Sequence, residues 1–281
     1  MATTRELQPD AADVNPAESS IRNTPDRRNR DLLEFCIAYG LIALAVWTPR
    51  PWQQGLSLAA LLWVLLTTWI SFDGWRAMGF RVEGFWRSTW VIGLAVALVA
   101  AGVALAAKLH TLHAPDTLGQ LVARYWSYTI WAFLQEFLLL NFFLLRLLRL
   151  LPNKIAAAMA ATALFALVHL PNPILTPLTL IWGYAACLIF LRYRNLYIPA
   201  VVHALFGICI AVTIPGPVDH NMRVGLGYLT YRAHGHHRVG VQRSQNQGSQ
   251  NQRSQIDHTV STVAWEMAEA PMRRSLRQAR P

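Results

Sequence analysis

The chain has 281 residues, of which 54% are hydrophobic and only 14% are charged, and its formal net charge is +10. Soluble globular domains carry about 25% charged residues, so this composition excludes an ordinary soluble domain and is typical of a polytopic membrane protein. The positive charge is mostly arginine in loops and tails, where it orients membrane spans and contacts anionic lipid. We therefore expect membrane lipid as a partner, and no nucleic acid.

The first 31 residues are polar and rich in Pro, Asn, Asp and Arg. They hold no apolar stretch that a signal peptidase would recognise, and they have too little apolar surface to pack. The stretch ends in Arg27, Arg28 and Arg30, just before the first apolar segment. A disordered, cytoplasmic N-terminus over residues 1–31 is the prediction, because clustered arginines beside a span stay in the cytoplasm.

A transmembrane domain is predicted over residues 32–214, because seven apolar segments follow one another there. Each is close to the ~20 residues that a helix needs to cross the hydrocarbon layer. The fourth is too long for a simple span, so it must tilt, extend past the headgroups or break near its start. The fold class is therefore all-α, a polytopic membrane helix bundle of about seven transmembrane helices. The segments lie near 33–48, 55–72, 88–107, 120–148, 154–170, 175–193 and 197–214.

Basic residues alternate between the loops and set an orientation. They gather after the second, fourth and sixth segments, and the opposite loops hold few. The chain is thus predicted to be a multi-pass protein of the cell membrane with a cytoplasmic N-terminus. The side of the C-terminal tail stays open, since seven spans put it outside although it is basic. The residues that mark the cytoplasmic loops are Arg76, Arg81, Arg87, Arg146, Arg149, Lys154, Arg192 and Arg194.

The character of the chain changes at Pro215. Residues 238–256 are rich in Gln, Ser, Asn and Arg, a composition with too little apolar surface to form a core. A polar, disordered C-terminal tail is predicted over residues 215–281.

Three ionisable residues interrupt the apolar segments: Glu136, His169 and His203, on three successive segments. An ionisable group at membrane depth costs roughly 2.5 to 3.5 kcal/mol even on a lenient insertion scale, so it marks a functional site. A carboxylate and two imidazoles can activate water and stabilise the oxyanion formed when water attacks an amide. Each residue alone has a plainer reading, a hydrogen-bond partner between helices. Straight parallel helices would hold the three at different depths, so we expect the fifth segment to be tilted or displaced.

The three blocks, their order and their spacing resemble the CPBP family, the CAAX prenyl endopeptidase and bacteriocin-processing membrane proteins, also called glutamic intramembrane proteases. The resemblance covers residues 73 to 212, with a core at about 118–212. The family signature is Glu-Glu-x-x-x-Arg, then Phe-x-x-x-His, then His-x-x-x-Asn. It implies cleavage of a peptide bond by water that the first Glu and a His activate, with the other His and the Asn binding the oxyanion.

The match to this signature is partial. Phe165 and His169 fit the second block, and His203 begins the third, but Gly207 stands where Asn is expected. In the first block, Gln135 and Glu136 can fill the paired-glutamate positions, which puts Leu140 in the place of Arg. Alternatively Glu136 takes the first position, and Phe137 and Asn141 fill the others. We prefer the second register, because Glu136 is the available base.

The resemblance thus implies catalytic roles for Glu136, His169 and His203, with Gln135, Asn141, Phe165 and Asn172 in support. The expected function is an intramembrane endopeptidase acting on a membrane-embedded or lipidated peptide or protein. The alternative is a catalytically silent relative that keeps the fold as a scaffold or binding protein. No cofactor is expected, and zinc held by the Glu and the two His is the alternative, since these are ligands that zinc accepts.

Overall fold

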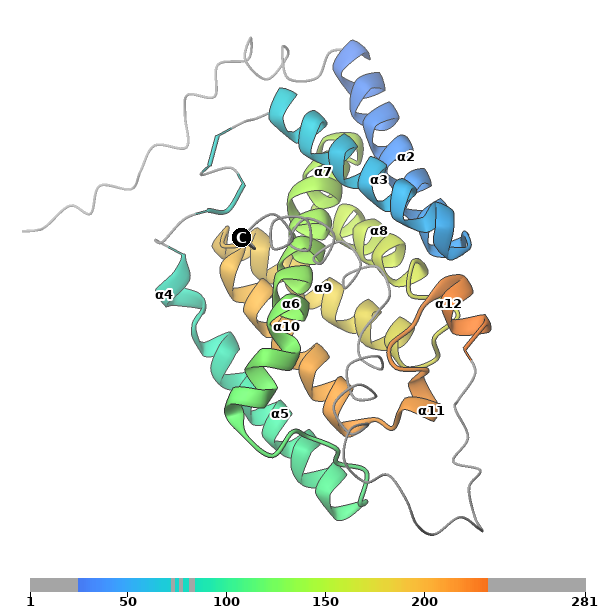
Figure 1. Ribbon diagram of the computed structural model, residues 1–281. Helices are drawn as coiled ribbons and strands as arrows, with labels where there is room; N and C mark the ends of the chain where they lie inside the picture. Colours follow the sequence, from blue (N-terminus) through green and yellow to red (C-terminus); the bar gives the residue numbers. More distant parts are fainter. Residues whose placement is uncertain (1–24, 72–73, 76–77, 81–83, 232–281) are drawn as a thin grey trace, which may run out of the picture.

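The computed structural model describes residues 25–71, 74–75, 78–80 and 84–231. All regular structure within these ranges is helical (Figure 1), which confirms the predicted all-α fold. In chain order the helices are α2 (Pro25–Trp47), α3 (Arg50–Ile70), α4 (Phe85–Ser88), α5 (Trp90–Lys108), α6 (Leu118–Glu136), the π-helix η1 (Phe137–Leu144), α7 (Leu145–Leu150), α8 (Lys154–Leu167), α9 (Leu175–Tyr193), α10 (Tyr197–Thr213), α11 (Gly216–Asp219) and α12 (Gly225–Leu229).

Each of the seven predicted segments coincides with a long helix or a run of joined helices, which confirms a multi-pass membrane bundle. By length and composition, four described stretches can cross a membrane: Arg50–Ile70, Phe85–Lys108, Leu118–Leu150 and Leu175–Tyr193. The helices α8 and α10 are apolar but shorter. The first turns of α2 are charged, which lowers its hydropathy. Since four described stretches meet the length and hydropathy of a span, the count of about seven transmembrane helices stays a prediction.

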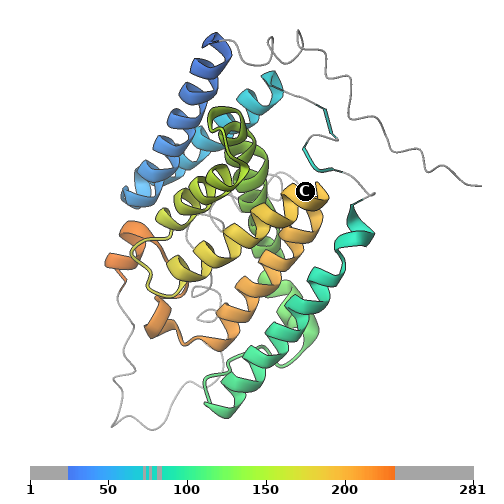
Figure 2. The same ribbon diagram turned by 180° about the vertical axis from the view of Figure 1, so that it is seen from behind.

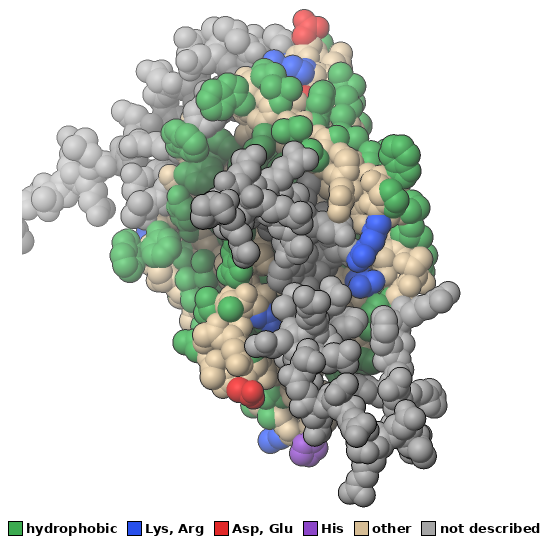
Figure 3. All heavy atoms as spheres, in the orientation of Figure 1, with side chains coloured by type: hydrophobic (Ala, Val, Ile, Leu, Met, Phe, Trp, Pro, Cys, Tyr) green, Lys and Arg blue, Asp and Glu red, His purple; other side chains and the backbone are tan. Residues whose placement is uncertain are grey.

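Large apolar side chains cover much of the outer surface. Trp69 on α3, Leu118 on α6 and Trp86 on α4 are 81%, 76% and 74% exposed. Figure 3 shows apolar side chains along both edges of the visible face. Soluble monomers rarely expose apolar surface so widely, and hydrocarbon is the solvent that such a surface suits.

The fourth predicted segment forms one uninterrupted helical stretch from Leu118 to Leu150. It does not break near its start; it changes instead from α- to π-helix at Phe137 and returns to α-helix at Leu145. Because π turns use i to i+5 hydrogen bonds, they set side chains at a different angle from an α-helix and often mark functional sites. The change begins directly after Glu136.

One buried core cluster forms where η1, α7, α8 and α9 meet. The helix α10 packs against both α5 and α6, and α8 packs against α9. Figures 1 and 2 show α8 and α9 running obliquely to the long helix that contains α6, as the sequence predicts for the fifth segment. The buried face of α8 is made of small residues, Ala157, Ala158 and Ala161, which let two helix backbones approach closely in a membrane.

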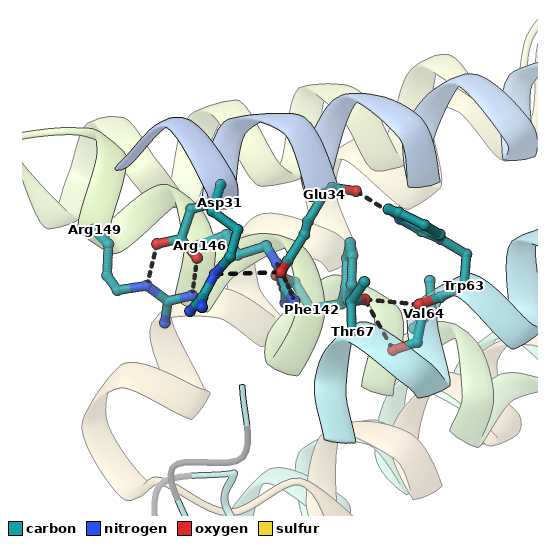
Figure 4. Close-up of polar contacts among 9 residues, drawn as sticks. Asp31, Glu34, Trp63, Val64, Thr67, Phe142, Arg146 and Arg149 are labelled. Atoms are coloured by element: carbon teal, nitrogen blue, oxygen red, sulfur yellow. Dashed lines mark hydrogen bonds and ion pairs between the residues drawn. The ribbon is translucent and has the colours of Figure 1, made fainter. Parts of the chain in front are cut away.

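The helix α2 is joined to α7 by two ion pairs, one buried and one half-buried (Figure 4). Asp31 binds Arg149 through contacts of 2.7 and 2.8 Å. Glu34 binds Arg146 through contacts of 3.2 and 2.7 Å, and the guanidinium carbon of Arg146 lies 3.7 Å from the ring centroid of Phe142. These arginines thus serve as structural partners as well as topology signals.

The predicted disorder over residues 1–31 is therefore wrong for its last part, since α2 begins at Pro25. The physical reason is that the acidic side chain of Asp31 finds a cation on α7, which residue composition alone does not reveal. Residues 1–24 lie outside the described residues.

The predicted disordered tail at 215–281 is likewise wrong at its start, where α11 and α12 form. The N–H of Gly225 donates to the carbonyl of Leu170 at 2.7 Å. Gly225 has φ +55°, and a Cβ there would collide with Val46 of α2. Backbone hydrogen bonds and a close approach to α2 thus hold a polar segment that has little core of its own. Residues 232–281 lie outside the described residues.

The ion pair of Glu34 and Arg146 yields a stability prediction. Glu34→Gln leaves the guanidinium of Arg146, only 3% exposed, without its carboxylate. Breaking a buried pair from one side costs about 3–5 kcal/mol, so the free energy of unfolding in mixed micelles should fall by that amount. The control is Asp26→Asn, on the exposed first turn of α2, where a change within about 0.5 kcal/mol is expected. Equal stability of the two variants would contradict a structural role for the pair.

Candidate functional site

Glu136 lies at the centre of the bundle, at the junction of α6 and η1, and its side chain is fully buried. Two groups from other helices reach its Oε1 atom. The indole Nε1 of Trp182, on α9, donates to it at 2.6 Å, and the Nδ1 atom of His203, on α10, lies 2.9 Å from it. A buried carboxylate needs such partners, because an unpaired one is very costly. The contact requires α6, α9 and α10 to converge at one point.

The two histidines hold defined ring orientations. Nδ1 of His169 lies 2.7 Å from the carbonyl of Phe165, which only accepts hydrogen bonds. This assigns the proton of neutral His169 to Nδ1 and the lone pair to Nε2. The contact to the Glu136 carboxylate assigns a proton to Nδ1 of His203 in the same way.

Phe165 brings the two histidines into one cluster. Its ring centroid lies 4.9 Å from that of His169 and 6.0 Å from that of His203, both edge-on. The side chain fits closely over Gly183 of α9, where an added Cβ would come within 3.3 Å of the Phe165 ring. Phe165 therefore acts as a packing support, and Glu136, His203 and His169 form a contiguous group through it.

Asn172 positions the turn that carries His169. Its backbone N–H donates to the carbonyl of His169 at 3.1 Å. Its Oδ1 accepts from the N–H groups of Ile174 and Leu175, which caps the start of α9, and its Nδ2 donates to two carbonyls of the C-terminal segment, those of Asp219 and Arg223. Since the amide is fully engaged, its contribution is to fix the turn and not to contact a substrate.

Gln135 and Asn141 differ in their surroundings. Gln135 is half-buried and lines a cavity next to the site. Asn141 is buried, and among the described residues neither atom of its amide has a hydrogen-bond partner; the same is true of Oε2 of Glu136. Buried polar atoms are rarely left unpaired. Because Asn141 follows Glu136 by five residues through π-helix, it lies about one π turn away.

A cavity of 760 Å³ lies against this group, between α2, α3, α5, α6, α9 and α10. Its lining is almost entirely apolar, with side chains such as Val64, Leu94 and Ile189. His169 and His203 are among the lining residues, whereas Glu136 is not. The cavity therefore offers an apolar ligand a chamber with two imidazoles in its wall, and the carboxylate lies behind one of them.

The arrangement of possible metal ligands bears on the zinc alternative. In the described part of the chain, no group of three or more His, Cys, Asp and Glu side chains is arranged to hold a metal ion. Nδ1 of His203 is bonded to the carboxylate and Nδ1 of His169 to a backbone carbonyl. Zinc held by Glu136, His169 and His203 stays a prediction.

Two residues at the site escape sequence reasoning, Trp182 and Tyr128. Trp182 is the second partner of Glu136, and Tyr128 on α6 packs its hydroxyl onto the helix α10 at Gly207. The sequence feature that could have pointed to them is that the O–H of a buried Tyr and the N–H of a buried Trp usually have a hydrogen-bond partner. Neither belongs to the motifs used to find the site, so the signal does not single them out among the 11 Trp and 8 Tyr of the chain.

Comparison with known proteins supports the family suggested by the motifs. Residues 117–209 match the family model described as Rce1-like, type II CAAX prenyl endopeptidase. The matched range contains Glu136, His169 and His203. No curated protein and no solved structure matches the chain. Residues 117–209, which carry the buried carboxylate and the two histidines, are therefore similar to the Rce1-like type II CAAX prenyl endopeptidase family.

Proposed function

We propose that this protein is an intramembrane endopeptidase in which Glu136 and His203 activate water for attack on a peptide bond. The observation that carries the proposal is the 2.9 Å contact between the Glu136 carboxylate and Nδ1 of His203. A carboxylate that orients one nitrogen of an imidazole leaves the other nitrogen as a general base, the logic of catalytic triads.

The sequence by itself predicts Glu136 as the base, and the burial of its side chain favours a relay through His203. In this mechanism Nε2 of His203 takes a proton from water as the water oxygen bonds to the scissile carbonyl carbon. Glu136 stabilises the imidazolium that forms, and Trp182 holds the carboxylate in place. The imidazolium then returns the proton to the leaving nitrogen as the carbon–nitrogen bond breaks. Nε2 of His169, which carries a lone pair, accepts a hydrogen bond from the other O–H of the water and so orients it; that hydrogen stays on the attacking oxygen.

The substrate that we propose is a lipidated, prenylated C-terminal peptide. The family description names prenyl endopeptidases, and the 760 Å³ cavity offers a prenyl chain an almost wholly apolar wall. In a membrane the prenyl chain exchanges lipid tails for the cavity wall, so close packing, and not transfer out of water, would hold it there. The two histidines in the wall then stand next to the peptide that follows the lipid.

Glu136→Gln tests the enzyme against a silent scaffold. The variant keeps the shape of the side chain and removes its charge, so turnover of a fluorogenic peptide with a farnesylated cysteine and three further residues should fall at least ~10²-fold. Turnover by His203→Ala should fall by a similar factor. The double variant should be little slower than either single variant, because the effects of residues that act on the same water are not additive. His113→Ala, at an exposed loop histidine, is the control. Wild-type turnover by Glu136→Gln would favour the scaffold.

We also propose that hydrolysis needs no resident metal, since the described residues hold no group of three His, Cys, Asp and Glu side chains arranged for a metal ion. Incubation of the purified protein with 1,10-phenanthroline followed by gel filtration should leave the rate of peptide cleavage unchanged. A loss of activity that zinc restores would contradict this proposal.

For the orientation, we propose a cell-membrane protein with a cytoplasmic N-terminus, supported by the basic loops after the second, fourth and sixth predicted segments. Reporter fusions after Asn153 and after Arg194 should both read as cytoplasmic. A fusion after Lys108, at the end of α5, should read as external. One reversed reading among the three would overturn the orientation.

A further inference from the structure

Gly207 gives the hydroxyl of Tyr128 a place against the backbone of α10. A Cβ at position 207 would overlap the hydroxyl and collide with the ring of Tyr128. The helices α6 and α10 pack directly on each other, and Tyr128 is 5% exposed. The absence of a side chain at 207 is thus a structural requirement of this contact.

The position of this hydroxyl relative to His203 follows from helix geometry. His203 and Gly207 are four residues apart on α10, so they share one face. The bond from Cα to Cβ in a helix tilts toward the N-terminus. The space that the hydroxyl fills above Gly207 therefore lies on the side of His203. His203, Gly207 and Tyr128 all line the apolar cavity.

The hydroxyl is also chemically available. Among the described residues, Tyr128 makes no hydrogen bond through its hydroxyl, although buried tyrosines usually find a partner. Asn172 has its amide fully bonded, and Asn141 is buried but does not line the cavity. Tyr128 is consequently a hydrogen-bond donor in the cavity wall, one turn of α10 from the proposed base.

We propose that the Tyr128 hydroxyl binds the oxyanion of the tetrahedral intermediate, an inference that rests on the proposed function. As the water oxygen bonds to the carbonyl carbon, the electron pair of the carbon–oxygen double bond moves to the carbonyl oxygen. The O–H of Tyr128 donates to that oxygen. When the double bond re-forms, the carbon–nitrogen bond breaks and the nitrogen takes the proton from His203. Tyr128 thereby supplies the donor that the His-x-x-x-Asn pattern places at position 207.

Tyr128→Phe is the direct test. It keeps the ring over Gly207 and removes the donor, so kcat for the farnesylated peptide should fall about 10²- to 10³-fold, the usual loss of one oxyanion donor, with KM unchanged. A phosphonate analogue of the scissile bond, which carries the oxyanion charge, should bind more weakly by a similar factor, while the uncleaved peptide binds as in wild type. Tyr125→Phe, at another buried tyrosine of α6 that does not line the cavity, is the control.

A donor swap separates catalysis from packing. Gly207→Asn alone should lose activity, because the new side chain collides with Tyr128. Tyr128→Ala removes the collision and the donor together, and Tyr128→Ala combined with Gly207→Asn should recover at least tenfold over Tyr128→Ala alone.

The outcomes distinguish the two proposals. If Glu136→Gln is inactive while Tyr128→Phe keeps wild-type kcat and phosphonate affinity, the role of Tyr128 is overturned and the enzyme stands. If Glu136→Gln cleaves the peptide as fast as wild type, the proposed function is wrong, and the oxyanion role of Tyr128 is overturned with it. A Tyr128→Phe protein that binds peptide and phosphonate equally poorly has a packing defect, which also overturns the oxyanion role.

Discussion

The rest of the structure depends on the buried carboxylate of Glu136. A charge taken out of water is tolerated only with close partners, and these come from two other helices, Trp182 on α9 and His203 on α10. The convergence of α6, α9 and α10 follows from this need. Phe165, packed over Gly183, extends the group to His169. One electrostatic constraint therefore fixes both the centre of the bundle and the geometry of the site.

The ion pairs between α2 and α7 fix one wall of the cavity. Asp31 and Glu34 bind arginines of α7, which continues the same helix that carries Glu136. Residues of α2 such as Tyr39 and Val46 line the cavity wall, so these ion pairs fix the wall relative to the site. Because α2 contacts the C-terminal segment as well, the two ends of the described chain meet at the cavity.

Departures from the family motif have different physical meanings in the structure. The space that a side chain at position 207 would take is filled by the Tyr128 hydroxyl, a polar group from α6. Asn141, in the place of Arg in the preferred register, is buried in the π-helical stretch directly after Glu136. The space at Gly207 is thus filled by a hydroxyl from another helix, whereas neither polar atom of the Asn141 side chain has a hydrogen-bond partner among the described residues.

The sequence by itself determined the helical membrane bundle, the positions of its long helices and the family resemblance, because apolar length and the order of Glu136, His169 and His203 are properties of the chain. It misjudged residues 25–31 and 215–231, whose polar composition predicts disorder, since their order comes from partners distant in sequence. It also had no means of joining Trp182 to Glu136 or Tyr128 to Gly207. Those contacts cross between helices, and only their packing angles and the π-helical turn after Glu136 decide which side chains meet.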